Sequence, residues 1–284
     1  MPSPTEETAS PIAVVGLGQM GGGMAATLAR AGVEVLGADP GSVDTPEGVA
    51  RVELDEALEL ADVLVLSLPG GEQVQTVVDR VLETDRPTLI IDTSTCDPAD
   101  SRRRAEALRE RGHSFVDAPL SGGPAGARTG QLTVFLGCAD QDLDRVRQIL
   151  GPMAARITHV GAVGAGHSAK LVNNLLCGIH LCAAGTLLQV AEGAGIEPER
   201  LLEAINTASG RSGVTEVNLP TWVLSGTFDS GFPVGLMARD VALAADVAGE
   251  LGAGSPVVEA AREMWSDLLA EAGPGVDFNR MVRQ

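Results

Sequence analysis

The sequence contains no tyrosine, and aromatic residues make up only 2% of its 284 positions. A tyrosine general acid is therefore excluded, and the aromatic platforms on which nucleic-acid bases stack are nearly excluded as well. Positive charge is also scarce, because the formal net charge is −18. A protein this acidic is repelled by nucleic acid and by anionic membrane surfaces. We therefore expect neither among its partners, and a core built of alanine, valine, leucine and isoleucine.

Cysteine is equally rare, with four residues and no C-x-x-C pair. The first ten residues are polar and lack the apolar run of a signal peptide. Together these features predict reduced thiols and a cytoplasmic protein. The four histidines are scattered, and neither they nor the cysteines have metal-ligand spacing. We therefore predict no metal site. His167 lies three residues before Lys170, and a surface position is favoured over a contact with the cleft. The arginine run at residues 102–104 is predicted to form a solvated face.

The most apolar run of the chain, residues 171–191, is about long enough to span a bilayer. It nevertheless contains polar side chains and has no basic flanking pattern; the polar residues are Asn173, Asn174, His180 and Gln189. Because unpaired polar groups are costly in lipid, a membrane span is disfavoured. The pattern favours a helix buried between domains or subunits, and so a homo-oligomer.

A glycine-rich turn lies between an apolar run at residues 12–15 and a helical pattern that continues to Ala31. The turn has the form G-x-G-x-x-G and consists of Gly16, Leu17, Gly18, Gln19, Met20 and Gly21. The first glycine permits the tight turn, the second lets the backbone approach a pyrophosphate, and the third lets the helix pack closely. The helix N-terminus then offers free N–H groups to the phosphates. A glycine turn without a ligand is the alternative, but the strand–turn–helix context predicts a dinucleotide site.

The next predicted strand, residues 33–38, ends at Asp39. A carboxylate at this place accepts hydrogen bonds from both ribose hydroxyls and repels a 2′-phosphate. No arginine follows it, since the next residues are Pro40 and Gly41. The sequence therefore favours NAD as the cofactor, with NADP less favoured.

Strand and helix patterns alternate over the first half of the chain, which predicts an α/β fold with a Rossmann-type, doubly wound parallel sheet. The further predicted strands are residues 61–68, 87–92, 114–118 and 132–137, with helices at 53–60, 72–82, 98–111 and 141–150. From Ser168 onward only helical patterns occur, at 170–192, 199–209, 214–224, 236–250 and 256–271. We therefore predict a dinucleotide-binding domain at 1–163 and an all-α substrate and oligomerisation domain at 164–284.

Lysine occurs once, at position 170, because nineteen of the twenty basic residues are arginines. Arginine stays protonated at any working pH, whereas a lysine can give or take a proton when its surroundings tune it. Lys170 opens the long apolar helix and shares one helix face with Asn174. Gly164 and Gly166 precede it and allow another chain segment or a ligand to approach closely. Lys170 is therefore the candidate proton-transfer residue, with an ordinary solvated lysine as the alternative.

Four motifs carry a resemblance that covers nearly the whole chain. They are G-L-G-Q-M-G-G-G-M-A at 16–25, D-A-P-L-S-G-G at 117–123, G-A-G-H-S-A-K-L-V-N-N at 164–174 and L-M-A-R-D at 236–240. In this order and spacing they resemble the cofactor, substrate, catalytic and late motifs of the β-hydroxyacid dehydrogenase family, whose best-known member is 3-hydroxyisobutyrate dehydrogenase. One departure stands out, because Arg239 occupies the place where the family usually has lysine.

The resemblance implies a role for each matching position. Lys170 would act on the substrate hydroxyl as general acid and base, and Asn174 would orient that oxygen. The substrate carboxylate would bind Ser121 and the backbone of Gly122 and Gly123. The implied cofactor-binding residues beyond the glycine turn and Asp39 are Leu68, Pro69, Gln73, Thr95 and Arg239. Arg239 could equally form only an ion pair with the neighbouring Asp240. Family members form dimers and tetramers, so a homodimer or homotetramer is expected.

These features predict an NAD-dependent oxidoreductase that oxidises the 3-hydroxyl of a small β-hydroxyacid, such as 3-hydroxyisobutyrate, to a semialdehyde. One alternative is an NADPH-dependent reductase of small aldehyde acids of the tartronate semialdehyde, succinic semialdehyde or glyoxylate type. The other, of a different class, is a non-catalytic scaffold that binds a dinucleotide. The presence of Lys170 favours an enzyme over that scaffold.

Overall fold

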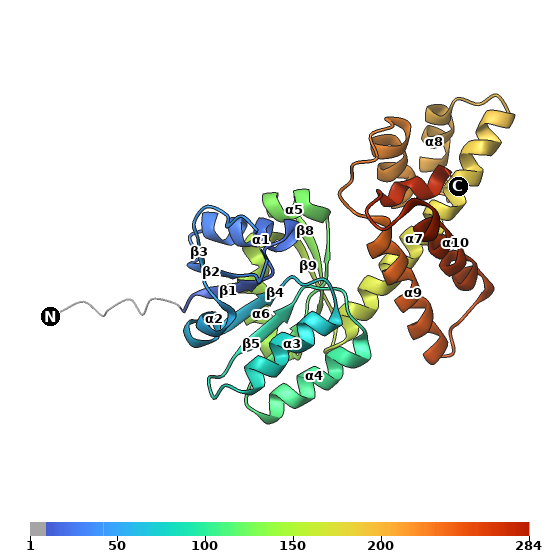
Figure 1. Cartoon of the computed structure of the whole chain (residues 1–284). Helices are drawn as coiled ribbons and strands as arrows, with labels where there is room; N and C mark the ends of the chain where they lie inside the picture. The colour runs from blue at the N-terminus through green and yellow to red at the C-terminus, as the bar shows by residue number, and fades with distance from the viewer. Residues whose placement is uncertain (1–9, 42, 284) are drawn as a thin grey trace. The chain divides into compact units, whose positions relative to one another are not determined.

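The structure is a computed structural model and describes residues 10–41 and 43–283. The chain divides into two compact units, Met1–Lys170 and Leu171–Gln284. Within the described residues, strands occur only in the first unit, while the second consists of helices and loops (Figure 1). The division falls inside helix α7 (Ala165–Gly193), whose first turns belong to the first unit. The boundary predicted between residues 163 and 164 lies just ahead of this helix.

The first unit is built on one sheet. Its strands are β1 (Ile12–Val15), β2 (Val35–Ala38), β3 (Val49–Arg51), β4 (Val63–Leu66), β5 (Leu89–Asp92), β6 (Ser114–Asp117), β7 (Leu120–Ser121), β8 (Leu132–Gly137) and β9 (Ala154–Gly161). Their spatial order is β3-β2-β1-β4-β5-β6-β8-β7, with β9 beside β8. The neighbours from β3 to β6 are all parallel, whereas β8 runs antiparallel to β6 and β7. The predicted doubly wound parallel sheet is confirmed from β3 to β6, and the antiparallel β8 departs from that prediction.

Helices cover both faces of the sheet, because the central strands β1, β2 and β4 contain no polar side chain. Their bounds are α1 (Gln19–Arg30), α2 (Leu54–Leu60), α3 (Gly71–Leu82), α4 (Pro98–Glu110), α5 (Gly123–Thr129) and α6 (Leu143–Leu150), with single turns η1 (Asp140–Asp142) and η2 (Gly151–Met153). In β4, Val63 and Val65 pack with α1, α5 and α6, whereas Leu64 and Leu66 pack with α2, α3 and α4. Period-2 alternation thus produces two apolar layers from one continuously apolar strand.

Three strands and one helix of the first unit lie outside the sequence predictions. β3 and β7 have three and two residues, too few to show a period. β9 carries Arg156, Thr158 and His159 and is only partly buried, so it lacks the apolar run of the central strands. α5 begins at Gly122 and Gly123, both with positive φ, which reads as a loop in the sequence.

The second unit is helical, as predicted. Beyond α7 it contains α8 (Pro198–Asn206), a π-helical segment η3 (Val214–Leu224), α9 (Val234–Glu250), α10 (Pro256–Ala272) and a 3-10 turn η4 (Phe278–Arg283). Its core gathers around Trp265, which is fully buried. Gly178 of α7 allows this indole to lie close, since a Cβ at Gly178 would be 2.9 Å from the indole Nε1.

Helix α7 is the one helix of the described residues that is long and apolar enough to cross a membrane by length and composition. Its most apolar 18-residue window has a mean hydropathy of 1.6. Leu181 and Ala184 of this helix belong to the core of the helical unit, which accounts for the apolar composition on that side. The exposed side still carries Val172, Leu176 and Val190.

Candidate functional site

The glycine turn between β1 and α1 has the shape of a phosphate cradle. Gly16 adopts φ +92°, and a Cβ there would lie 2.3 Å from the Ser67 carbonyl oxygen. At Gly21 a Cβ would lie 1.8 Å from the Gly16 carbonyl oxygen. Gly18, by contrast, has nothing within 4 Å of the Cβ position, and α1 starts directly after it without a side-chain cap. Open space therefore faces free helix N–H groups, and the turn fits a bound pyrophosphate.

Asp39 follows β2 and lies beside this turn. Its Oδ2 accepts a hydrogen bond from the Leu17 N–H at 2.6 Å, and its Oδ1 accepts one from the Gly41 N–H at 2.7 Å. The carboxylate is thereby fixed at the edge of the cradle, where its remaining lone pairs can accept ribose hydroxyls. Arg51 of β3 donates to the carbonyl oxygens of Gly41 and Val43, at 2.9 and 3.2 Å, and to that of Asp39. No arginine follows Asp39 directly in the sequence, but the fold brings Arg51 to the same loop.

The loops after β4 and β5 are tied to one another. The Leu68 N–H donates to the Ser94 hydroxyl oxygen at 3.1 Å, and the Thr93 hydroxyl donates to the Leu66 carbonyl at 2.6 Å. Thr95 follows Ser94 directly and is partly exposed. Pro69 and Gln73, the other two residues predicted to line the cofactor cleft, are exposed at the start of α3. The predicted cofactor residues of this unit therefore all follow the carboxyl ends of parallel strands, where ligands gather in such sheets.

The first turn of α7 is anchored to β6 by one carboxylate. Asp117 Oδ1 accepts from the Gly164 N–H and Oδ2 from the His167 N–H, each at 2.7 Å. The helix start also packs directly on strand backbone, because a Cβ at Gly166 would lie 2.5 Å from the Phe135 carbonyl oxygen and 2.7 Å from that of Asp117. The close approach predicted at Gly164 and Gly166 is thus made by β6, β8 and α4 of the same unit.

Replacing Asp117 by alanine is expected to destabilise the first unit by roughly 2 kcal/mol or more, because two buried N–H groups lose their acceptor at about 1–3 kcal/mol each. Asp117→Asn keeps the shape and one acceptor, so a smaller loss is expected. Thermal unfolding should therefore rank wild type above Asp117→Asn, and Asp117→Asn above Asp117→Ala, with about 2–4 °C for each kcal/mol. Equal melting temperatures for all three proteins would contradict the anchoring role.

The same carboxylate gives a pH dependence. Burial raises the pKa of Asp117 above its usual 3.8, although His167 and the backbone N–H groups of Gly164 and His167 oppose this effect. Between pH 3.8 and the raised pKa of Asp117, the folded state therefore binds more protons than the unfolded state. The contribution of Asp117 to the free energy of unfolding falls as pH rises through this range. The difference in free energy of unfolding between wild type and Asp117→Asn should become smaller as pH rises through this range. Denaturation at several pH values measures it, and a widening difference would contradict the assignment.

Lys170 lies one helical turn after His167 and is 8% exposed. The predicted substrate residues of the same unit follow β6. Ser121 ends β7, and Gly122 and Gly123 adopt φ +124° and +61° at the start of α5. A Cβ at Gly123 would meet nothing within 4 Å, so the backbone is open there. These conformations favour glycine and explain why two glycines follow the serine.

The two remaining predicted residues, Asn174 and Arg239, belong to the helical unit, and both contact Asp240. Asn174 Nδ2 donates to Asp240 Oδ2 at 2.7 Å, and Arg239 forms an ion pair with Asp240 Oδ1 at 3.0 Å. The ion-pair alternative for Arg239 is therefore present in the structure. Asp240 is 1% exposed and fixes the Asn174 amide, a role that sequence reasoning missed. The motif at residues 236–240 points to Asp240, since it places this acid directly after Arg239.

Two sequence predictions about surface residues are wrong. His167 is fully buried instead of lying on the surface, because it occupies the buried turn that packs on β6 and β8. In the arginine run, Arg102 and Arg103 are exposed but Arg104 is only 5% exposed. Arg104 donates from Nε to the Gln75 side chain at 3.0 Å and from Nη2 to the Gly71 carbonyl at 2.8 Å. Its guanidinium therefore supports the start of α3.

One group of potential metal ligands occurs among the described residues. Side-chain atoms of Asp92, Cys96 and His167 all lie within 4.8 Å of one another, and all three residues are buried. The Cys96 thiol donates to Asp92 Oδ2 at 3.6 Å, and His167 Nε2 lies 3.9 Å from the same oxygen. His167 Nε2 is closer to the Ser94 carbonyl, at 3.1 Å. Hydrogen bonds account for these contacts, and the absence of a metal site stays a prediction.

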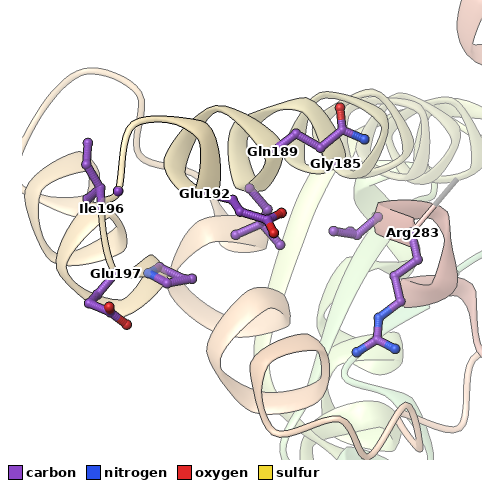
Figure 2. Close-up of a pocket in the computed structure, with 10 residues that line it drawn as sticks. Gly185, Gln189, Glu192, Ile196, Glu197 and Arg283 are labelled. Atoms are coloured by element: carbon purple, nitrogen blue, oxygen red, sulfur yellow. The ribbon is translucent and has the colours of Figure 1, made fainter.

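Two of the surface hollows in the described part of the chain contain no predicted site residue. One, of about 590 Å³, lies in the helical unit and is shown in Figure 2. Its labelled lining residues are Gly185, Gln189, Glu192, Ile196, Glu197 and Arg283. The two glutamates disfavour a carboxylate substrate there. The other, of about 430 Å³, lies between α3 and α4 and includes Arg104. The candidate site is therefore defined by the strand ends and not by these hollows.

Two protein-family models cover nearly the whole chain. Residues 11–161 match the NAD-binding domain of 6-phosphogluconate dehydrogenase. Residues 164–284 match a domain described as NAD-binding of NADP-dependent 3-hydroxyisobutyrate dehydrogenase. The first match contains the glycine turn, Asp39, Thr95 and Ser121, and the second contains Lys170. Each of the four motifs thus falls inside a matched domain.

Individual proteins give the same result over the full length. A probable 3-hydroxyisobutyrate dehydrogenase of Mycobacterium tuberculosis is 35% identical over 283 residues, covering 95% of this chain and 96% of that protein. An NAD-dependent L-serine dehydrogenase of Pseudomonas aeruginosa is 33% identical over 285 residues, covering 94% and 95%. The solved structure of the M. tuberculosis 3-hydroxyisobutyrate dehydrogenase with L-serine has a TM-score of 0.88 at 33% identity, covering 97% of this chain and 98% of that one.

Proposed function

This chain belongs to the β-hydroxyacid dehydrogenase family, and we propose that it is an NAD-dependent dehydrogenase that oxidises the 3-hydroxyl of a small β-hydroxyacid of the 3-hydroxyisobutyrate type to a semialdehyde. The observation that carries the proposal is the position of its single lysine. Lys170 follows a helix turn that Asp117 and His167 anchor to the carboxyl edge of the nucleotide-binding sheet. A chain that uses arginine at every other basic position has kept lysine here.

In this reaction the chain's residues handle the proton and the carboxylate. Bound NAD supplies the hydride acceptor. Lys170 in its neutral form takes the hydroxyl proton as the C–H hydride leaves the same carbon, and in the reverse direction its ammonium group returns that proton to the carbonyl oxygen. Asn174, held by Asp240, orients the oxygen. Ser121 and the N–H groups of the Gly122–Gly123 turn hold the carboxylate, so a protein of net charge −18 can still bind an acid.

The preference for NAD is part of the proposal and rests on Asp39. Its carboxylate is fixed by the N–H groups of Leu17 and Gly41 at the edge of the cradle, where a 2′-phosphate would be repelled. Arg51, the nearby cation, already donates to backbone carbonyls of the same loop. An NADPH-dependent reductase of small aldehyde acids is the alternative, since the family includes NADP-dependent members.

Asp39→Asn should move the cofactor preference toward NADP. The ratio of kcat/KM with NAD to kcat/KM with NADP is expected to fall by about tenfold or more, since a change of about 1.4 kcal/mol suffices for that factor. Asp44→Asn makes the same charge change at an exposed position of the neighbouring loop and should leave the ratio near that of wild type. A wild-type protein that already prefers NADP would contradict the proposed role of Asp39.

The direct test is a substrate panel read by nicotinamide absorbance. It should include 3-hydroxyisobutyrate, L-serine and tartronate-type acids in the oxidising direction, and succinic semialdehyde and glyoxylate in the reducing direction, each with both cofactors. We expect turnover of a β-hydroxyacid with NAD. No hydride transfer on any member of the panel, with retained NAD binding, would favour a dinucleotide-binding scaffold instead.

We further propose that the protein is a cytoplasmic homodimer or homotetramer. Analytical ultracentrifugation measures the oligomeric state.

A further inference from the structure

We propose that His167 is a positioning residue for this reaction. Its ring ties the loop that carries Thr95 to the helix turn that leads to Lys170. This inference rests on the proposed function, because it concerns the placement of the group that moves the proton. His167 itself lies inside the first unit and is assigned no contact with substrate or cofactor.

Three contacts of His167 reach three different elements. Its Nδ1 lies 2.7 Å from the Ser101 hydroxyl oxygen of α4, and its Nε2 lies 3.1 Å from the Ser94 carbonyl oxygen in the loop after β5. Its backbone N–H donates to Asp117 at the end of β6. His167 and Ser101 are fully buried, and Ser94 is 5% exposed. The ring therefore has a fixed orientation, because both of its nitrogens are engaged where water has little access.

The loop that this ring holds is connected to the predicted cofactor residues. Ser94 accepts the Leu68 N–H through its hydroxyl and contacts the His167 ring through its carbonyl. Thr95, the predicted neighbour of the nicotinamide ribose, is the next residue in the chain. Leu68, Ser94 and His167 thus form a chain of hydrogen bonds along the carboxyl edge of the sheet.

On helix α7, the turn that contains His167 leads directly to the amine of Lys170. Residues three positions apart in an α-helix lie on neighbouring parts of one face, so Lys170 follows His167 by about one turn. A displacement of the His167 turn relative to Ser94 therefore moves Lys170 relative to Thr95. A misplacement of about 1 Å between reacting groups can cost about 100-fold in rate.

The chain offers a matched control in His113. It is 3% exposed, and its Nδ1 accepts the Thr88 N–H at 3.3 Å. Burial lowers the pKa of His113, which is consistent with a neutral ring that accepts this hydrogen bond. Thr88 and His113 directly precede β5 and β6, at the amino ends of these strands and opposite the strand ends that carry the candidate site. Removing either ring creates a cavity in the same sheet, but only one of the two rings contacts the Ser94 loop.

The experiment compares His167→Ala, His167→Gln, Ser101→Ala and His113→Ala in the full-length protein. For His167→Ala we expect kcat per folded molecule to fall by about 10- to 100-fold. Glutamine can donate from its side-chain amide to the Ser94 carbonyl, so His167→Gln should recover most of the loss. Ser101→Ala, which removes the partner of Nδ1, should give a smaller decrease. His113→Ala should lower the melting temperature while keeping kcat and the NAD KM near wild type.

A second readout does not depend on turnover. Because the chain has one lysine side chain, an amine-modifying reagent followed by peptide mass spectrometry reports the accessibility of Lys170 alone. We expect the modification rate of the protein without cofactor to rise by about tenfold in His167→Ala through local opening of the turn, and to stay unchanged in His113→Ala.

The outcomes separate the two proposals. An inactive wild type rejects the proposed function, and the modification rates then still test the link. An active wild type with unchanged kcat, NAD KM and modification rate in His167→Ala rejects the positioning role. Equal losses of kcat in His167→Ala and His113→Ala at equal losses of melting temperature also reject it, because a structural role alone would explain them. If His167→Ala does not fold, Ser101→Ala decides, and wild-type kcat together with a wild-type modification rate in that variant rejects the inference.

Discussion

Lys170→Ala should lose turnover by about 10²–10⁴-fold, the range that general acid–base groups contribute, while still binding NAD. The amine is the group proposed to take the hydroxyl proton. The cofactor cradle lies at the β1–α1 turn, and Lys170 provides none of its atoms. Steady-state kinetics with the best substrate of the panel gives the loss of kcat, and calorimetric titration gives NAD affinity.

Lys170→Arg is the informative control for this prediction. Arginine keeps the positive charge, on a longer and planar head group, but cannot release a proton at working pH. If Lys170 acts through proton transfer, the arginine variant should be nearly as inactive as the alanine variant. If it acts only as a positive charge for the carboxylate, the arginine variant should retain much of the wild-type rate. Wild-type kcat in the alanine variant would reject the catalytic assignment altogether.

Gly18→Ala should weaken NAD binding by at least about tenfold without lowering the stability of the protein alone. The structure leaves open space around the Gly18 Cβ position, and its φ of −59° suits alanine. The added methyl group would occupy the space proposed for the pyrophosphate. Loss of one or two charge-assisted hydrogen bonds from the helix N-terminus, at about 1.5–3 kcal/mol each, is sufficient for this change in Kd. Calorimetry measures the affinity, and thermal unfolding without NAD measures the stability.

Gly21→Ala makes the same chemical change three residues later and should behave in the opposite way. Its Cβ would lie 1.8 Å from the Gly16 carbonyl oxygen, so the turn or the helix must shift, at a cost of about 3 kcal/mol. Reduced stability in Gly21→Ala together with unchanged stability in Gly18→Ala would support separate roles for packing and cofactor approach. If Gly18→Ala binds NAD as tightly as wild type, the cofactor does not occupy this cradle.

Several elements could be predicted from local sequence because their signals are local. The apolar runs of β1 and β8 give these strands their observed bounds, and the π-helical segment Val214–Leu224 coincides with the predicted helical stretch. The glycine turn was equally readable, since each of its glycines answers a backbone requirement within the same strand–turn–helix unit. By contrast, β3, β7 and α5 are too short or too rich in glycine to show a period.

The errors concern contacts between residues far apart in sequence. The predicted surface position of His167 is wrong because β6, β8 and α4, which are distant from it in sequence, cover it. Arg104 was expected in solvent with its two arginine neighbours, yet Gly71 and Gln75 of α3 receive its hydrogen bonds. Arg51 lies beside the Asp39 loop because parallel pairing of β2 and β3 brings residues twelve positions apart together, and local sequence does not show that pairing.

The sequence by itself determined the class of chemistry, because one lysine, one glycine turn and one acid after the second strand are choices of residue type that need no partner to be recognised. The tertiary structure alone decided how these groups are held. Asp117 reaches Gly164 across 47 positions and Asp240 fixes Asn174 across 66, through hydrogen bonds that depend on which chain segments the fold brings together. Composition and periodicity contain no information about such pairings, since they arise only when distant segments are packed and their polar groups must find partners away from water.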